Sequence, residues 1–281
     1  MDSLLELEPL LKEALREDLG DGDITTEAVV GGREMCSGRN VCAEVVARDE
    51  IVLAGWPVFS RVFQFLGDAV SKQANREGDL VQPGVIGTVQ ANASVLLGAE
   101  RVALNLFQRS CGIATLTRVI VRLVAHTGVQ ILDTRKTMPL WRALDKYAVR
   151  IGGGVNHRWS LGDAILIKEN HIVIAGSVEK AVSAALQHTP SPGRVEVEVE
   201  TLAQLQEALS AGAEIVLLDN MPPAQVKRAV EIAAGNCSLE VSGGITLDNV
   251  VSYAETGVDF ISIGTLTHSP PASDISLRFS K

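Results

Sequence analysis

The chain has 281 residues, of which 46% are hydrophobic, and a formal net charge of −9. This length allows one large domain or two unequal ones, and the acidic charge excludes general affinity for nucleic acid or anionic membranes. No apolar run approaches the roughly 18 residues of a membrane helix, and the acidic start at 1–20 lacks the features of a signal peptide. We therefore expect a cytoplasmic protein with no nucleic-acid or membrane partner.

The cysteines show neither a CxxC motif nor a Cys/His metal spacing. This pattern predicts reduced, mostly buried thiols, which agrees with a cytoplasmic location. The four residues, scattered along the chain, are Cys36, Cys42, Cys111 and Cys237.

The N-terminal part of the chain mixes helical and β-rich patterns. We predict a separate, sandwich-like α+β domain over residues 1–112, completed by 268–281, because turn signals separate the β-rich pieces. Its predicted elements are a helix at 4–20, β-rich segments at 41–53 and 79–97, and a helical stretch at 98–128 that breaks at Cys111-Gly112.

The second half alternates short apolar runs with segments of helical periodicity. Such alternation with short links predicts parallel strands joined by crossover helices. Six strands are near what a closed or nearly closed barrel needs, so we assign the chain to the α/β class with a catalytic β/α barrel over 113–267. The predicted strands lie at 129–133, 163–168, 195–199, 215–219, 238–242 and 259–263, with helices at 177–187 and 223–234 among the links.

Each predicted strand ends in polar residues or glycine. In β/α barrels the carboxyl ends of the strands meet on one face, which carries the active site. Ordinary polar caps of the following helices would explain two or three of the six ends, so we infer a functional site at this face. The ends are Asp133-Thr-Arg135-Lys136, Lys168-Glu-Asn-His171, Glu198-Val-Glu200, Asp219-Asn220, Ser242-Gly243-Gly244 and Gly264-Thr265.

Basic residues concentrate around the first two of these ends. Residues 131–170 hold seven Lys or Arg against four acids, a balance of +3 in a chain of −9. Arginine forks match carboxylates and lysines offer compact charges, so this group suits an organic dianion together with pyrophosphate. Surface charges of a helix are expected for Arg142, Lys146 and Arg150. The candidate ligands are Arg135, Lys136, His157, Arg158 and Lys168, with a core or capping role as the alternative for His157.

Two glycine turns follow the last two predicted strands. Adjacent glycines let backbone N–H groups approach an anion closely, so Gly243-Gly244 and Gly264-Thr265 predict a phosphate site. Tight turns without a ligand are the alternative. Gly152-Gly153-Gly154 lacks the spacing of a dinucleotide-binding loop and is discounted.

Two acids end neighbouring predicted strands and should lie within reach of one another. Glu198 and Asp219 suit ribose hydroxyls, Mg²⁺, or a sugar carbon that becomes positive during glycosyl transfer. Strand alternation puts Glu196, Glu198 and Glu200 on one face. Of these three, Glu198 is best placed at the rim, and Glu200 is expected to begin the next helix.

Taken together, these motifs resemble the quinolinate phosphoribosyltransferase family. The resemblance covers residues 13–278, and its motifs occur in order without a departure at a key position. They are Asp133-Thr-Arg-Lys-Thr137, Asp145-Lys-Tyr147, Gly152-Gly-Gly-Val-Asn-His157-Arg158, Lys168-Glu-Asn-His171, Glu196-Val-Glu198, Leu218-Asp219-Asn220 and Ser242-Gly-Gly-Ile-Thr246, with Glu17-Asp-Leu-Gly-Asp-Gly-Asp-Ile-Thr-Thr26 and Glu100-Arg101 upstream.

The resemblance implies phosphoribosyl transfer from phosphoribosyl pyrophosphate to quinolinate with loss of CO2, giving nicotinate mononucleotide for NAD biosynthesis. It implies an obligate homodimer, sometimes assembled further, in which Arg101 reaches the site of the partner subunit. Mg²⁺ would be held chiefly by substrate oxygens. The implied catalytic residues are Lys136, Lys168, Glu198 and Asp219, and the implied substrate-binding residues are Arg101, Arg135, Thr137, His157, Arg158, Lys168, Glu198, Asp219, Ser242, Gly243, Gly244, Gly264 and Thr265.

Two other functions share some of these features. A relative with the same fold, such as one encoded with molybdenum-transport genes, would act on another aromatic acid, but the intact 133–137 and 152–158 motifs favour quinolinate. A non-catalytic sensor of pyridine nucleotides would have no need to retain Lys136, Glu198 and Asp219. Pyrophosphate release on mixing the two substrates separates these functions.

Overall fold

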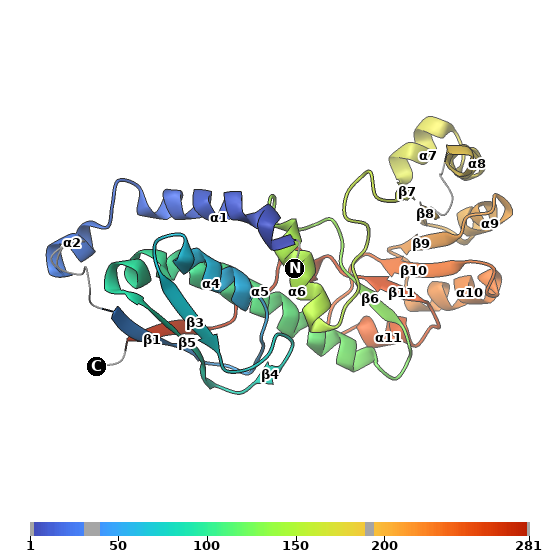
Figure 1. The fold of residues 1–281 in the computed structure, drawn as a ribbon. Coiled ribbons are helices and arrows are strands. Elements are labelled where there is room, and N and C mark those ends of the chain that lie inside the picture. Colours follow the sequence, from blue (N-terminus) through green and yellow to red (C-terminus); the bar gives the residue numbers. More distant parts are fainter. Residues whose placement is uncertain (1–2, 31–39, 189–193, 280–281) are drawn as a thin grey trace. The chain divides into compact units, whose positions relative to one another are not determined.

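The computed structural model describes residues 3–30, 40–188 and 194–279 (Figure 1). Contacts divide the chain into two units. The chain passes between the units more often than the predicted domains 1–112 and 113–267 require, because residues 137–153 lie inside the second predicted domain but belong to the first unit. The first unit comprises Met1–Arg118, Thr137–Gly153 and Ser269–Lys281, and the second comprises Val119–Lys136 and Gly154–His268.

The first unit is built on a four-stranded antiparallel sheet in the order β12-β1-β5-β3. Its edge strand β12 comes from the end of the chain and pairs with β1, so that Val45 lies opposite Leu277. The strands are β1 Asn40–Ala47, β3 Ala69–Gln73, β5 Gly84–Asn92 and β12 Ile275–Phe279, and β2 Ile51–Val52 forms a separate ladder with β4 Leu80–Val81.

Helices pack against this sheet around an aromatic core. In α1, the buried Leu7, Leu11 and Leu15 recur every four residues and form one apolar face. Helix α4 contacts both α1 and β3, and the ring of its Phe59 lies 5.0 Å from that of Phe107 in α5. The helices are α1 Ser3–Leu19, α2 Ile24–Val30, α4 Trp56–Gln64, α5 Ala93–Val124 and α6 Arg142–Gly152.

The predicted helix break at Cys111-Gly112 is wrong, because α5 runs without interruption through both residues. A Cβ at position 112 would lie 1.9 Å from the carbonyl oxygen of Pro271. Glycine is therefore required by the close approach of the C-terminal segment and not by a turn. The predicted β-rich segment 79–97 also ends early, since α5 begins at Ala93.

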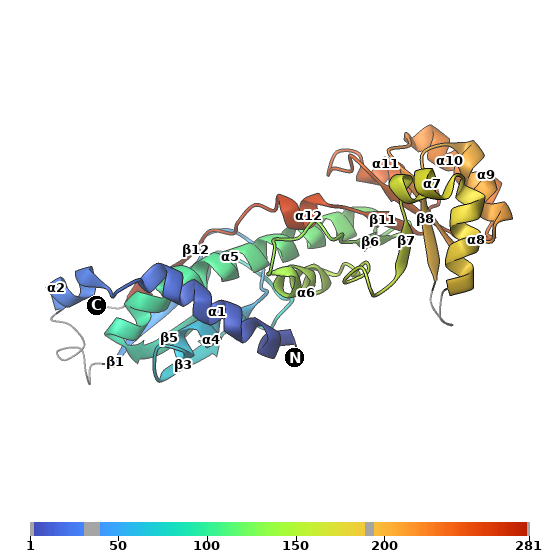
Figure 2. The same cartoon turned by 90° about the horizontal axis from the view of Figure 1, so that it is seen from above.

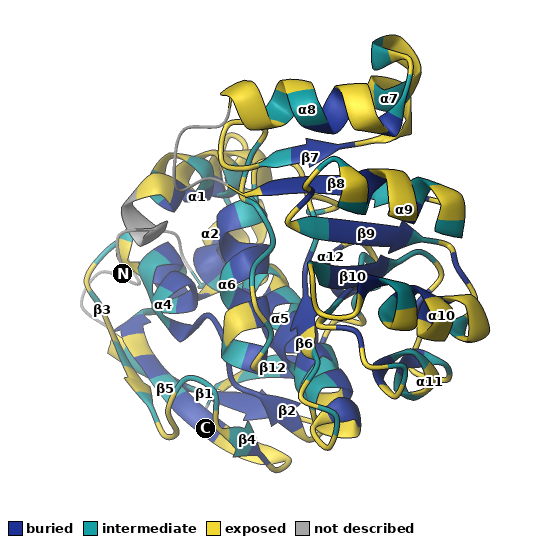
Figure 3. Cartoon of the chain, turned by 90° about the vertical axis from the view of Figure 1, so that its right-hand side faces the viewer, coloured by how far each residue is buried: buried dark blue, intermediate teal, exposed yellow. Residues whose placement is uncertain are grey.

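The second unit contains a six-stranded parallel sheet in the order β6-β11-β10-β9-β8-β7, and it confirms the predicted barrel class. Figure 3 shows that the middle strands are largely buried, as expected for parallel strands covered on both faces. No ladder joins β6 to β7 within the described ranges, so the barrel is open there. The strands are β6 Gln130–Leu132, β7 Ile165–Ile167, β8 Val195–Val199, β9 Ile215–Asp219, β10 Ser238–Ser242 and β11 Phe260–Ser262.

Consecutive helices of this unit lie against one another along the sheet (Figure 2). The hydroxyl of Thr201 accepts a hydrogen bond from the N–H of Gln204 and caps α9. Glu200 therefore precedes this helix and does not begin it. The helices are α7 Glu169–Ala175, α8 Val178–His188, α9 Leu202–Ser210, α10 Pro223–Ala233, α11 Val250–Ala254 and α12 Thr265–His268.

No helix in the described part of the chain is both long and apolar enough to cross a membrane. Three cysteines are free thiols: Cys42 is exposed, Cys111 is buried and Cys237 is half-buried. The prediction of buried thiols is therefore correct for Cys111 and wrong for Cys42 and Cys237, and Cys36 lies outside the described residues.

Helix α6 buries charged side chains. The carboxylate of Asp145 is fully buried and accepts hydrogen bonds from Nε of Arg109 at 2.8 Å, from Nη2 of Arg109 at 2.7 Å and from the N–H of Met138 at 3.0 Å. The predicted surface position of Lys146 is wrong, because this side chain is also fully buried. Arg150 is exposed, as predicted.

Asp145→Ala should lower the free energy of unfolding by about 3–5 kcal/mol, because the Arg109 guanidinium would lose its carboxylate in a mostly buried place. Glu44→Ala is the matched control. It breaks the more exposed pair of Glu44 with Arg278 and should cost less than about 1 kcal/mol. Urea unfolding of both variants measures the difference, and equal losses would contradict the structural role given to Asp145.

Candidate active site

A cavity of about 580 Å³ lies at the carboxyl ends of the parallel strands in the second unit. Every one of the six strands, or the segment that follows it, supplies lining residues. The lining consists of Thr134, Arg135, Lys136, His157, Arg158, Leu166, Lys168, Glu198, Leu217, Asp219, Asn220, Glu240, Ser242, Gly243, Gly244 and Ser262.

Most of the predicted site residues are part of this lining, and four are not. Gly264 and Thr265 follow β11, and a Cβ on Gly264 would lie 3.0 Å from Cδ of Lys136. The other two belong to the first unit. Arg101 is exposed on α5, and the hydroxyl of Thr137 accepts a hydrogen bond from Nε of the half-buried Arg142 at 3.1 Å.

Two arginines lie near one another in the pocket. Burial lowers the pKa of Arg158, and the positive charge of Arg135 lowers it further. Nη1 of Arg158 donates a hydrogen bond to the carbonyl oxygen of Ala164 at 3.1 Å, which holds the guanidinium in place. Because an anion between two like charges relieves their repulsion, this arrangement favours a carboxylate ligand.

Two carboxylates and two lysines share another part of the pocket. Lys168 at the end of β7 pairs with Glu198 on the neighbouring β8. Burial and the charge of Glu198 raise the pKa of Asp219, whereas a hydrogen bond from Asn220 and the charges of Lys168 and Lys136 lower it. A group that gains positive charge, such as a reacting sugar carbon, would be stabilised between the carboxylates.

The turn after β10 requires glycine at two adjacent positions. Gly243 and Gly244 have φ angles of 94° and 63°, in the region that favours glycine. A Cβ on Gly243 would lie 2.2 Å from Oδ1 of Asn220. The N–H of Asn220 donates to the carbonyl oxygen of Ser242 at 2.9 Å, and its side-chain amide donates to Asp219 at 2.7 Å. Asn220 therefore connects the glycine turn to the carboxylate at the end of β9.

A buried acid pair, Glu196 on β8 and Glu240 on β10, lies next to His157. Nε2 of His157 is 3.3 Å from Oε2 of Glu196 and 3.6 Å from Oε2 of Glu240. Nδ1 of the same ring accepts a hydrogen bond from the N–H of Arg158 at 2.7 Å. The backbone of His157 is held in turn by the buried Asp133, which accepts its N–H at 2.9 Å.

His157 and the acid pair are residue types that bind metal ions, and one ligand atom from each lies within 4.8 Å of the others. The hydrogen bond to Nδ1 of His157 decides against a metal here. Because Nδ1 uses its lone pair as an acceptor, the ring proton is on Nε2 and points to the carboxylates. A protonated nitrogen cannot ligate a metal, so the geometry favours a proton-sharing network.

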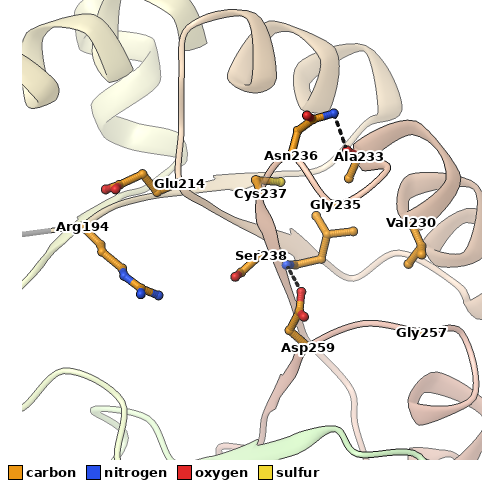
Figure 4. Close-up of a pocket in the computed structure, with 11 residues that line it drawn as sticks. Arg194, Glu214, Val230, Ala233, Gly235, Asn236, Cys237, Ser238, Gly257 and Asp259 are labelled. Carbon is orange, nitrogen blue, oxygen red and sulfur yellow. Dashed lines mark hydrogen bonds between the residues drawn. The ribbon is translucent and has the colours of Figure 1, made fainter.

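A second cavity, of about 460 Å³, lies at the amino-terminal ends of the strands (Figure 4). Its polar groups tie strands and loops together. Glu214 accepts the N–H of Val195 at 3.2 Å, and Asp259 accepts the N–H of Leu239 at 2.8 Å. Such bonding is typical of the face of a barrel that serves stability, so the catalytic site is assigned to the larger cavity.

Sequence reasoning missed four polar residues of the pocket lining: Thr134, Asn220, Glu240 and Ser262. A signal for Glu240 was present, because a charged residue between Leu239 and Val241 in a predicted buried strand needs a polar partner inside the protein. Asn220 was visible only as the residue after a candidate carboxylate, since its hydrogen bonds depend on the fold.

Two family models match the chain. The quinolinate phosphoribosyl transferase N-terminal domain matches residues 23–111, and the C-terminal domain of the same family matches residues 113–278. The matched ranges together include all of the pocket-lining residues. They confirm the resemblance found in the sequence motifs.

Individual proteins agree with the family models. Nicotinate-nucleotide pyrophosphorylase (carboxylating) of Mycobacterium leprae is 45% identical, with 95% of this chain and 95% of that relative covered. The protein of the same name from Homo sapiens is 38% identical, with 91% and 92% covered. The solved structure of the nicotinate-nucleotide pyrophosphorylase from Francisella tularensis is 39% identical, with a TM-score of 0.91 and 98% and 96% covered. This chain therefore belongs to the quinolinate phosphoribosyltransferase family.

Proposed function

We propose that the protein transfers a phosphoribosyl group from phosphoribosyl pyrophosphate to quinolinate, with loss of CO2, and so makes nicotinate mononucleotide for NAD biosynthesis. The observation that carries this proposal is the separation of charge within one pocket. Cations collect around Arg135 and Arg158, and carboxylates collect at Glu198 and Asp219. The names of the relatives from Mycobacterium leprae and Homo sapiens support the same reaction.

Quinolinate binds through its two carboxylates. Arg135 and Arg158 offer planar guanidinium groups that match a carboxylate with paired hydrogen bonds. Lys168 adds a third positive charge, and His157 lies behind Arg158, where its Nδ1 accepts the backbone N–H of that residue. Because several cations serve one small acid, a ligand with a single carboxylate would leave part of the group unused.

Phosphoribosyl pyrophosphate binds across the later strands. The backbone of Ser242–Gly244 receives the 5′-phosphate, and Gly264 with Thr265 completes this site. Glu198 and Asp219 face the ribose. Mg²⁺ would accompany this substrate and be held mainly by substrate oxygens, because it prefers phosphate ligands to a dedicated protein cage.

The chemistry follows from positioning and charge. The pyridine nitrogen bonds to the anomeric carbon as the bond from that carbon to the pyrophosphate oxygen breaks, and Lys136 and Lys168 offset the charge on the leaving group. Glu198 and Asp219 stabilise the positive sugar. When the 2-carboxylate then departs as CO2, its electron pair stays on the ring carbon and is stabilised by the quaternised ring. A proton from solvent bonds to that carbon. No side chain acts as a nucleophile.

The active protein is proposed to be a cytoplasmic homodimer in which each subunit lends Arg101 to the pocket of its partner. The exposure of Arg101 on α5 supports this, as does the lack of any hydrogen bond from its guanidinium within the described part of the chain. Thr137 is proposed as a further substrate contact. The free thiols of Cys42, Cys111 and Cys237 agree with a reducing compartment.

Quinolinate should be used at least about a hundredfold better than nicotinate, which lacks the 2-carboxylate. Loss of the hydrogen bonds to the 2-carboxylate costs about 1.5–3 kcal/mol for each charged group involved, and two such groups account for this ratio. The measurement is kcat/KM for both acids at saturating phosphoribosyl pyrophosphate, followed by pyrophosphate release. Comparable kcat/KM values for the two acids would contradict the assignment of quinolinate as the substrate.

Arg101→Ala and Lys168→Ala subunits, each inactive alone, should recover about a quarter of the parental activity when refolded together in equal amounts. Random pairing makes half of the dimers mixed, and one of the two sites in a mixed dimer has both residues intact. Activity of the refolded mixture is measured after subunit exchange has been confirmed by native mass spectrometry.

The matched control for this experiment is the mixture of Lys136→Ala and Lys168→Ala subunits, each of which lacks one of the two catalytic lysines. Both residues line the pocket of the same chain, so every site in a mixed dimer keeps one defect and no activity should return. If the mixture with Arg101→Ala recovers no more activity than this control, Arg101 does not act across the dimer.

A further inference from the structure

The buried acid pair places two carboxyl groups around one hydrogen-bond donor. Glu196 and Glu240 are 7% and 2% exposed. One oxygen of each faces Nε2 of His157, and the other oxygen, Oε1, has no hydrogen-bond partner within the described chain. Two buried like charges this close to one another cannot both be ionised at low cost.

The surrounding groups do not supply enough positive charge for two carboxylates. Nδ1 of His157 accepts a backbone hydrogen bond, which leaves the ring in its neutral form with the proton on Nε2. Burial raises the pKa of Glu240 to about 7, and Glu196 adds to this rise, whereas a hydrogen bond with Ser262 on β11 and the charge of Lys168 at the end of β7 lower it. A charged His157 would lower it as well, but the neutral ring carries no such charge. Arg158, in the segment between α6 and β7, also faces the pair, because its positive charge interacts with the charge of Glu196.

We propose that the acid pair holds one shared proton, and that Glu240 in this neutral form is a positioning residue for the anionic substrate. The inference rests on the proposed function, because it concerns the same pocket. Glu240 lines the pocket, so a second negative charge there would repel an incoming dianion. With one shared proton the acid pair keeps one negative charge next to Nε2 of His157, and this charge holds the ring whose Nδ1 accepts the backbone N–H of Arg158.

The shared proton links stability to pH in a way that needs no substrate. The folded protein binds the Glu240 proton more tightly than the unfolded chain, whose carboxyl has its ordinary pKa of 4.5. Below a pH of 4.5 both the folded and the unfolded protein bind this proton, so its contribution to stability is fully present there. As the pH rises from 4.5 to about 7, only the folded protein keeps the proton, and this contribution is lost. Glu240→Gln keeps the shape and the hydrogen bonds of a neutral acid and removes this dependence.

The first test is thermal melting of the parent, Glu240→Gln and Glu196→Gln proteins at pH 5 and pH 8. The difference in Tm between each of these variants and the parent (variant minus parent) should be higher at pH 8 than at pH 5 by about 4 °C or more. Glu196→Gln gives a second, independent measurement, because either substitution leaves a single carboxyl in the pair. Glu207→Gln, on the exposed face of α9, is the matched control and should show no such change. Differences in Tm that are the same at both pH values would overturn the shared proton.

The second test follows the KM for quinolinate in the same proteins. Between pH 6.5 and pH 8.5, KM of the parent and of Glu207→Gln should rise at least about threefold more than KM of Glu240→Gln. An identical rise in all of them would overturn the positioning role. No turnover of quinolinate by the parent would contradict the proposed function, and the melting comparison would still decide the shared proton.

Discussion

Opposite charges at the ends of neighbouring strands organise the pocket. Lys168 at the end of β7 pairs with Glu198 on β8, and the charges of both residues act on the pKa of Asp219 on β9. The pairing keeps a lysine at the boundary between the cationic part, around Arg135 and Arg158, and the carboxylate part. A dianionic acid and a sugar that becomes positive can therefore bind next to each other with their charges matched. The proposed reaction needs this juxtaposition, because no side chain attacks a substrate in it.

The parallel sheet makes this arrangement possible. Each strand enters the pocket at its carboxyl end, so residues far apart in the sequence meet without long loops. The strand pairing puts Ser242 directly beside Asp219, and Asn220 bridges the two through its backbone and side chain. The turn proposed to bind phosphate and the carboxylate proposed to face the ribose are consequently held by one set of hydrogen bonds, and a change in one strand end alters its neighbour.

Local pattern was enough to predict the barrel strands and most of the pocket, because strand ends are marked in the sequence by the change from apolar to polar residues. Local pattern failed where the position of a residue depends on a contact with a residue that is distant in the sequence. Gly112 is required by Pro271 and not by a turn, and Lys146 is buried although its helix has polar neighbours. Glu240 was passed over because its partner is Glu196, two strands away in the sheet.

The central claim is that the cations bind substrate whereas the carboxylates act on the transition state. Steady-state kinetics of Glu198→Gln and Arg158→Ala test it most directly. Glu198→Gln should lower kcat about tenfold or more with a small change in KM for quinolinate, because the charge it complements develops only during reaction. Arg158→Ala should instead raise that KM about tenfold or more and change kcat less. If Glu198→Gln leaves kcat within about twofold of the parent, the division of labour between the two parts of the pocket is wrong.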